Sequence, residues 1–131
     1  MAALRPDPFT AVVDPSVRRL GERTCVINLG TELRHFELPF VDEAIRAVMQ
    51  HDDCLDLVFD LTYLRRHEEF ALVRLAREWD RLDAAGCAVH VAAREARIVG
   101  DIERLASEGG GWQLHNSVTH ALRALLSTPV S

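Results

Sequence analysis

The chain contains no lysine, and all 15 of its basic residues are arginine. Without a lysine amine there can be no Schiff-base nucleophile, no phosphate-loop lysine and no lysine general base, which excludes several classes of enzyme. Positive charge is also in short supply, because 20 acidic residues leave a formal net charge of -5. Nucleic acids and anionic membranes demand clustered positive charge, so we expect neither as a partner.

Long apolar runs and a paired cysteine framework are missing as well. No stretch approaches the length of a membrane-spanning helix, and the N-terminal residues contain no apolar core of a signal peptide. Cys25, Cys54 and Cys87 are odd in number and widely spaced, and each lies in or beside an apolar segment. This pattern predicts buried, reduced thiols in a cytoplasmic protein.

The composition that remains is typical of one soluble globular domain. The 131 residues are 48% apolar and 27% charged, which is enough apolar surface for a single core. No repeat, linker or low-complexity tract divides the chain. We place the domain at residues 9–126, with short tails at 1–8 and 127–131.

Hydrophobic periodicity predicts strands and helices in alternation. Short, mostly apolar runs bounded by turn residues indicate strands at residues 9–13, 24–29, 55–61, 87–92 and 112–114. Apolar residues at helical spacing indicate helices at about 39–50, 68–85, 98–105 and 118–125. The order predicts an α/β fold, with a mixed, mainly parallel sheet of about four to five strands and about four helices. The N-terminal strands are free to pair antiparallel at one edge of this sheet.

Several local strings resemble one known family, in the family's own order. Gly30-Thr31-Glu32-Leu33 resembles the turn after the second strand of STAS domains, the fold of anti-sigma-factor antagonists. Residues 57–64 (LVFDLTYL) resemble their third strand, 83–92 (DAAGCAVHVA) their passage from helix to strand, and 114–125 (LHNSVTHALRAL) their last strand and helix. The resemblance extends from about Phe9 to Leu126 and implies a STAS-like fold for that whole stretch.

STAS domains open their second helix with a switch motif of the form Asp-Ser-Ser-Gly or Asp-Ser-Thr-Gly. Counting eight residues from the strand-end acid Asp60 brings this motif onto residues 68–71, Glu-Glu-Phe-Ala. The first acid of the motif is thus kept as Glu68, but Glu69 replaces the hydroxyl that is normally phosphorylated. No Ser or Thr occurs in residues 63–106, so the chain lacks the usual phosphoacceptor.

The resemblance implies that this loop and helix start bind a partner. The candidate residues are Arg65, Arg66, His67, Glu68, Glu69 and Phe70, with Asp60 at the end of the preceding strand. In the functional interpretation, Glu69 places permanent negative charge where the family places a phosphate, and the arginines with a pH-sensitive His67 form a charged recognition edge. In the simpler interpretation, acids in a first helical turn stabilise by about 0.3–1 kcal/mol each, and the arginines are their solvated partners.

Catalysis and metal binding find weaker support in the sequence. Adjacent helix residues diverge by about 100°, so Glu68 and Glu69 cannot face each other across a cleft as glycosidase carboxylates do. The run 51–54 (HDDC) is more typical of a polar turn than of a metal site, and Gly109–Gly111 of a flexible connection than of a nucleotide loop. His90 fits a sheet-face histidine better than a ligand. We therefore expect no enzyme activity, metal or cofactor.

The resemblance implies a non-catalytic protein-interaction module in regulatory signalling, of the anti-sigma-factor-antagonist type. Its expected partner is an anti-sigma factor or a serine-kinase-type regulator, and a homodimer is compatible with this role. Without the phosphoacceptor, control would come from partner availability or from a ligand. The alternative is a sensor or lipid-transport accessory domain of the same fold, which would bind a small molecule, a nucleotide or a lipid-system partner.

Overall fold

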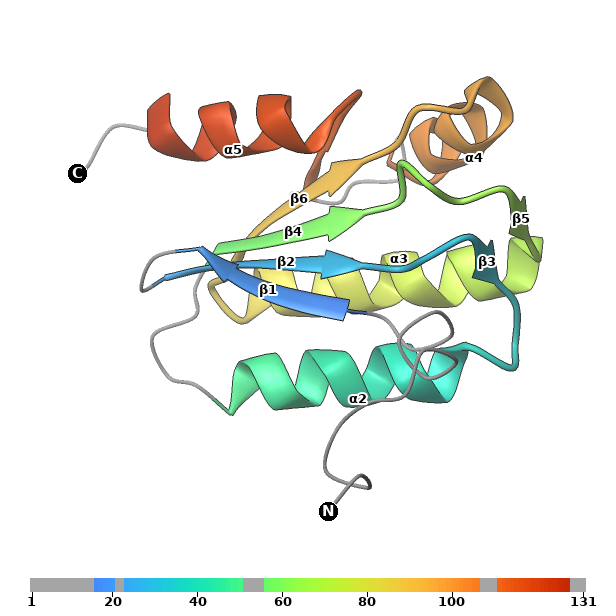
Figure 1. The fold of residues 1–131 in the computed structure, drawn as a ribbon, viewed down its shortest axis with the longest axis horizontal. Helices are drawn as coiled ribbons and strands as arrows, with labels where there is room; N and C mark the ends of the chain where they lie inside the picture. Colours follow the sequence, from blue (N-terminus) through green and yellow to red (C-terminus); the bar gives the residue numbers. More distant parts are fainter. Residues whose placement is uncertain (1–15, 21–22, 51–55, 107–110, 128–131) are drawn as a thin grey trace, which may run out of the picture.

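A five-stranded sheet forms the centre of the computed structural model, which describes residues 16–20, 23–50, 56–106 and 111–127 (Figure 1). Its strand order is β1-β2-β4-β6-β7. β1 runs antiparallel to β2, and all other neighbours are parallel. The predicted mainly parallel sheet with an antiparallel N-terminal edge is therefore confirmed. The strands are β1 Ser16–Leu20, β2 Thr24–Asn28, β4 Asp56–Asp60, β6 Ala88–Ala92 and β7 Gln113–His115.

Helices cover both faces of this sheet. The four that the structure describes are α2 Leu38–Met49, α3 Glu69–Ala84, α4 Ala96–Ala106 and α5 Val118–Ser127. α2 and α3 lie side by side on one face, and α5 lies on the other (Figure 1). Pro39 suits the first turn of α2 because no helical hydrogen bond needs its missing N–H. α3 ends where Gly86 adopts a positive φ of 101°, as the sequence predicts.

Alternating strand side chains supply two separate apolar layers. On the face toward α2, α3 and α4, the rings of Phe59 and Trp79 pack 5.7 Å apart, and Trp112 meets Trp79 edge-on at 4.8 Å. On the opposite face, Val58 is fully buried and packs with Ala121 of α5. Burial on both faces explains why β4 is a continuous apolar run rather than an alternating one.

His90 is confirmed as a sheet-face histidine. It is in register with Val58, so its side chain faces the same side as α5. Its Nδ1 lies 2.9 Å from Nε2 of His115, and the two rings stack. Burial lowers the pKa of both imidazoles, which favours the neutral forms.

Three features of the structure were not expected from the sequence. The strand expected at residues 9–13 lies outside the described residues, and the observed edge strand is β1, whose residues 17–20 are exposed and show no apolar alternation. Two further strands of two residues each, β3 Glu32–Leu33 and β5 Arg66–His67, form a separate parallel pair. Cys25 is disulfide-bonded, so the expected reduced thiol is wrong there, whereas Cys87 is free and buried. Spacing along the chain does not reveal which cysteines the fold brings together.

Candidate functional site

The loop between β4 and α3 is held against the turn before α2 by the β3–β5 pair. Thr31 O accepts hydrogen bonds from the backbone N–H of Arg65 and of Arg66, at 2.8 and 3.2 Å. The backbone N–H of Glu68 donates to Leu33 O at 2.9 Å. This ladder brings two segments that are far apart in sequence to the same end of the molecule, where α2 and α3 begin (Figure 1).

The two glutamates of the candidate switch have different surroundings. Glu68 is the residue that precedes α3, and its side chain does not cap that helix. Instead, Glu68 Oε1 accepts the backbone N–H of His35 at 2.9 Å and lies 3.1 Å from the His35 ring Nδ1. The backbone hydrogen bond, followed by the ring contact, lowers the pKa of Glu68 and keeps it ionised. Glu68 therefore fixes the turn at His35.

Glu69 is the first residue of α3 and points into solvent. Its side chain forms no hydrogen bond or ion pair with any other residue that the structure describes. Arg65 and Arg66 are exposed, and their side chains likewise have no hydrogen bond or ion pair within the described ranges. The solvated ion pairs that the simpler interpretation expected between these arginines and the glutamates are therefore not formed.

The side chain of His67 is buried although the residue as a whole is half-buried, which corrects the predicted place of its imidazole in an exposed recognition edge. Its side chain is only 6% exposed, and Nε2 lies 2.8 Å from Asp101 Oδ2 in α4. The hydrogen bond from His67 is the main cause that lowers the pKa of Asp101, and Arg104 contributes further. His67 thus attaches β5 to α4 and is not available to a partner.

Asp60 is also turned inward, at 4% exposure. Its Oδ2 accepts the Asn28 side-chain amide at 3.1 Å, and its Oδ1 accepts the Thr62 backbone N–H at 2.9 Å together with the Thr62 hydroxyl. Both carboxylate oxygens are occupied, so Asp60 organises the end of β4 and the first turn of the loop. Asp60 therefore supports the exposed residues of the loop from inside the fold and is not itself exposed.

Exposed aromatic side chains surround the helix start, and sequence reasoning found only one of them. Phe70 is 64% exposed, Tyr63 62% and Phe36 60%. Phe36 stacks on His35 with ring centroids 4.0 Å apart, and His35 is the residue that Glu68 holds. Aromatic residues are only 6% of the chain and are enriched in protein interfaces, but their exposure at Phe36 and Tyr63 is seen only in the structure.

We call this region the α3-start surface. It comprises the exposed residues Phe36, Tyr63, Arg65, Arg66, Glu69 and Phe70. A small cavity of about 240 Å³ adjoins it between α3 and α4. Its lining residues are Glu69, Leu72, Val73, Asp101, Arg104 and Leu105.

Metal and membrane sites are not observed in the described parts of the chain. No group of three or more His, Cys, Asp or Glu side chains in those parts is placed to hold a metal ion. Within the same ranges, no helix combines the length and the apolar character that crossing a membrane requires. The polar run at residues 51–54 and most of the glycine run at 109–111 lie outside the described residues.

The fold is that of anti-sigma factor antagonists. An anti-sigma factor antagonist from Mycobacterium paratuberculosis superposes with a TM-score of 0.69 at 23% identity, over 86% of this chain and 93% of that chain. The anti-sigma factor antagonist SpoIIAA in its unphosphorylated form gives a TM-score of 0.65 at 13% identity, over 87% of this chain and 99% of that one.

The Bacillus cell fate determinant SpoIIAA in its phosphorylated form gives a TM-score of 0.60 at 16% identity, over 85% of this chain and 98% of that chain. No family model and no curated protein sequence matches the chain. At these identities the likeness establishes the fold, and it confirms the STAS-like architecture that the resemblance implied.

Proposed function

We propose that this protein is a non-catalytic regulatory module that binds a protein partner through its α3-start surface. The observation that carries the proposal is the exposure of Phe36, Tyr63 and Phe70 beside unpaired charges of both signs. Aromatic side chains and arginine are the residues most enriched in the centres of protein interfaces. By analogy with the fold, the partner is an anti-sigma factor or a serine-kinase-type regulator.

In this proposal the negative charge of Glu69 is permanent and is not switched by phosphorylation. Residues 63–106 contain no Ser or Thr, and Glu69 is the first residue of α3, which the count from Asp60 aligns with the phosphoacceptor of the STAS motif. A carboxylate carries one negative charge, whereas a phosphoserine carries nearly two and has three acceptor oxygens. Glu69 therefore imitates the phosphorylated state only in part, and binding is controlled by partner availability or by a ligand elsewhere on the domain.

The small cavity beside Glu69 indicates the chemistry of the partner. Leu72 and Val73 supply apolar lining, and Glu69 supplies a carboxylate without a partner among the described residues. A basic side chain can lay its aliphatic stem on apolar surface while its charge meets an acid. We expect the partner to place an arginine or lysine here, with Phe70 packing alongside.

The test begins with affinity purification from the native cell, after which the affinity for the recovered partner is measured by calorimetry. Phe70→Ala should weaken binding by about tenfold or more, because an aromatic anchor at an interface centre contributes over ~1.4 kcal/mol. Glu69→Arg should weaken binding further and reduce its dependence on salt. Glu43→Arg is the control, since it makes the same charge change at an exposed position of α2 that is not part of this surface.

Equal affinity of wild type, Phe70→Ala and Glu69→Arg for the partner would contradict the proposal that the α3-start surface binds it. A second measurement addresses control by phosphate. Incubation with the cell's serine kinases should leave residues 63–106 unmodified, and Glu69→Ser should change the affinity for the partner. Stoichiometric phosphate within this segment of the wild type would contradict the proposed loss of the switch.

A further inference from the structure

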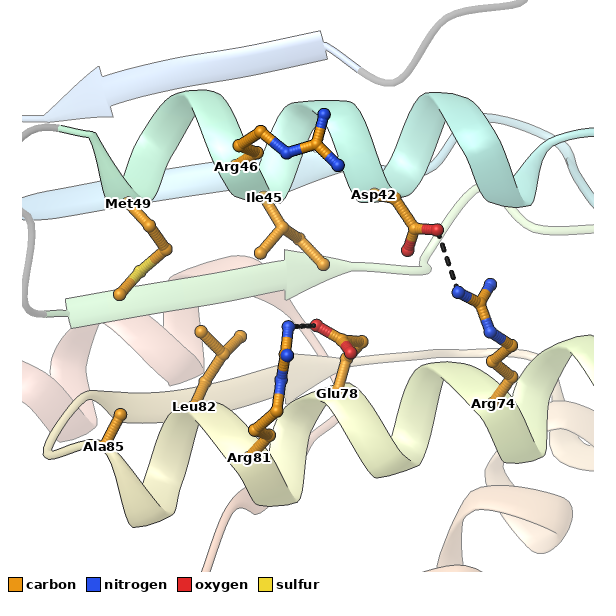
Figure 2. A pocket seen from close by; sticks show the side chains of 9 residues that line it. All are labelled: Asp42, Ile45, Arg46, Met49, Arg74, Glu78, Arg81, Leu82 and Ala85. Atoms are coloured by element: carbon orange, nitrogen blue, oxygen red, sulfur yellow. Dashed lines mark hydrogen bonds and ion pairs between the residues drawn. The ribbon is translucent and has the colours of Figure 1, made fainter.

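A groove of about 580 Å³ runs between the outer sides of α2 and α3 (Figure 2). None of the residues of the α3-start surface lines it. Its volume lies within the range of about 300–1,000 Å³ that is typical of small-molecule sites. The lining residues are Asp42, Ile45, Arg46 and Met49 from α2, with Arg74, Glu78, Arg81, Leu82 and Ala85 on the side of α3.

The floor of the groove is aliphatic. Ile45 and Leu82 are each 4% exposed and face each other from the two helices. Met49 and Ala85 extend this apolar surface toward the C-terminal ends of the helices (Figure 2). Because Met49 is 38% exposed, a ligand in the groove would cover apolar side-chain surface, which favours an aliphatic group over a purely polar one.

Basic side chains outnumber acidic ones around the floor of the groove. Arg74 crosses from α3 to pair with Asp42 of α2 at 2.9 Å, and Arg81 pairs with Glu78 at 2.7 Å (Figure 2). Arg46 lies along the α2 rim and has no hydrogen bond or ion pair from its side chain to another residue in the described ranges. The lining thus holds three arginines and two acids, a local positive excess in a chain of net charge -5.

We infer that this groove binds a small amphipathic anion, a carboxylate carried on a short aliphatic chain. The planar guanidinium of Arg46 can meet a carboxylate with two parallel hydrogen bonds, which an ammonium group or a neutral amide cannot do. The aliphatic chain then lies on Ile45, Leu82 and Met49. Such a ligand would supply control of the module without phosphorylation, although the groove and its ligand stand independently of the proposed partner surface.

The inference is tested by titrating the full chain with sodium octanoate and following the backbone amide resonances by NMR. Shifts should be saturable and concentrated at residues 45–49 and 82–85. Octan-1-ol lacks the charge and so loses the charge-assisted hydrogen bond, whereas acetate lacks the chain and so loses the buried methylenes. Each should bind at least about tenfold more weakly than octanoate.

Two variants and a matched control locate the site. Arg46→Gln should weaken octanoate binding by about tenfold, and Ala85→Phe should abolish it by filling the groove. Arg77→Gln removes the same charge from an exposed position of α3 outside the groove, and its affinity should equal that of the wild type. Arg46 also lies in the last turn of α2, so thermal melts must show each variant folded at the titration temperature.

Equal affinity for octanoate and octanol, shifts centred outside the two helices, or an equal loss in Arg77→Gln would each overturn the inference. Absence of any saturable shift with octanoate would overturn it as well. Partner binding through the α3-start surface is measured separately, so failure here leaves that proposal intact.

Discussion

The contact between His67 and Asp101 should be a measurable source of stability, because it attaches the loop that carries the α3-start surface to α4. Asp101→Asn removes the charge but keeps the size of the side chain. The hydrogen bond is 2.8 Å long, the His67 side chain is 6% exposed and that of Asp101 26% exposed. A hydrogen bond to a charged group contributes about 1.5–3 kcal/mol when buried, and partial exposure of Asp101 reduces this to about 1–2 kcal/mol.

Urea unfolding at pH 7, followed by tryptophan fluorescence, measures the effect. The midpoint should fall for Asp101→Asn while the slope with urea stays unchanged. The melting temperature should fall by about 3–5 °C for each kcal/mol lost in a domain of this size. Glu78→Gln is the control: it breaks the pair with Arg81, which is 74% exposed, and should change stability by less than about 0.5 kcal/mol.

The stabilisation by the contact between His67 and Asp101 should decrease in acid. The hydrogen bond from His67 lowers the pKa of Asp101 in the folded state below its ordinary value of 3.8. The stabilisation is therefore fully present above that ordinary value and is lost as the pH falls through the lower folded pKa. The difference between wild type and Asp101→Asn should vanish in that acidic window. Equal midpoints at pH 7, or a difference that persists in acid, would refute the assignment of this contact.

Three further results are expected. Trp79→Phe should cost less than about 2 kcal/mol in urea unfolding, since it removes a buried indole N–H without a hydrogen-bond partner, whereas Trp79→Ala should cost about 3–5 kcal/mol. Burial lowers the pKa of His90 and His115 in the folded state, so unfolding should become easier as the pH falls below 6.5, and His90→Gln should flatten that slope. Glu68→Ala should leave α3 intact by circular dichroism but speed amide hydrogen exchange at His35, whose N–H it releases.

The larger elements could be predicted because their burial is periodic along the chain. The apolar stripe of α3 is an example: Leu72, Leu75, Ala76, Trp79 and Leu82 are all buried, as helical spacing predicts. β1 has no such signal, because residues 17–20 are exposed and the strand is defined by its pairing with β2. The two-residue strands β3 and β5 are likewise defined by a partner 34 residues away rather than by local pattern.

The sequence named the residues of the candidate site but did not predict how their side chains are oriented. Glu68 meets His35 across 33 positions of the chain, and His67 meets Asp101 across 34. Neither contact can be predicted from the residues next to it in the sequence. Glu68 and Glu69 were therefore expected to have similar surroundings, and His67 was expected to be exposed. Phe36 escaped notice for the same reason, since nothing in its turn sequence distinguishes an exposed ring from a buried one.

The polar residues of the loop divide into those that hold it and those that remain free. Asp60, His67 and Glu68 each make their hydrogen bonds within the fold, to Asn28 and Thr62, to Asp101 and to His35 respectively. A surface fixed in this way loses little conformational entropy when a partner docks, which raises affinity without any added contact. In the proposed function Glu69 replaces a switchable hydroxyl, which fits such a preformed surface because neither its charge nor its shape then has to be assembled. Under the same proposal, control acts from outside this surface, on the partner or through a second site such as the groove between α2 and α3.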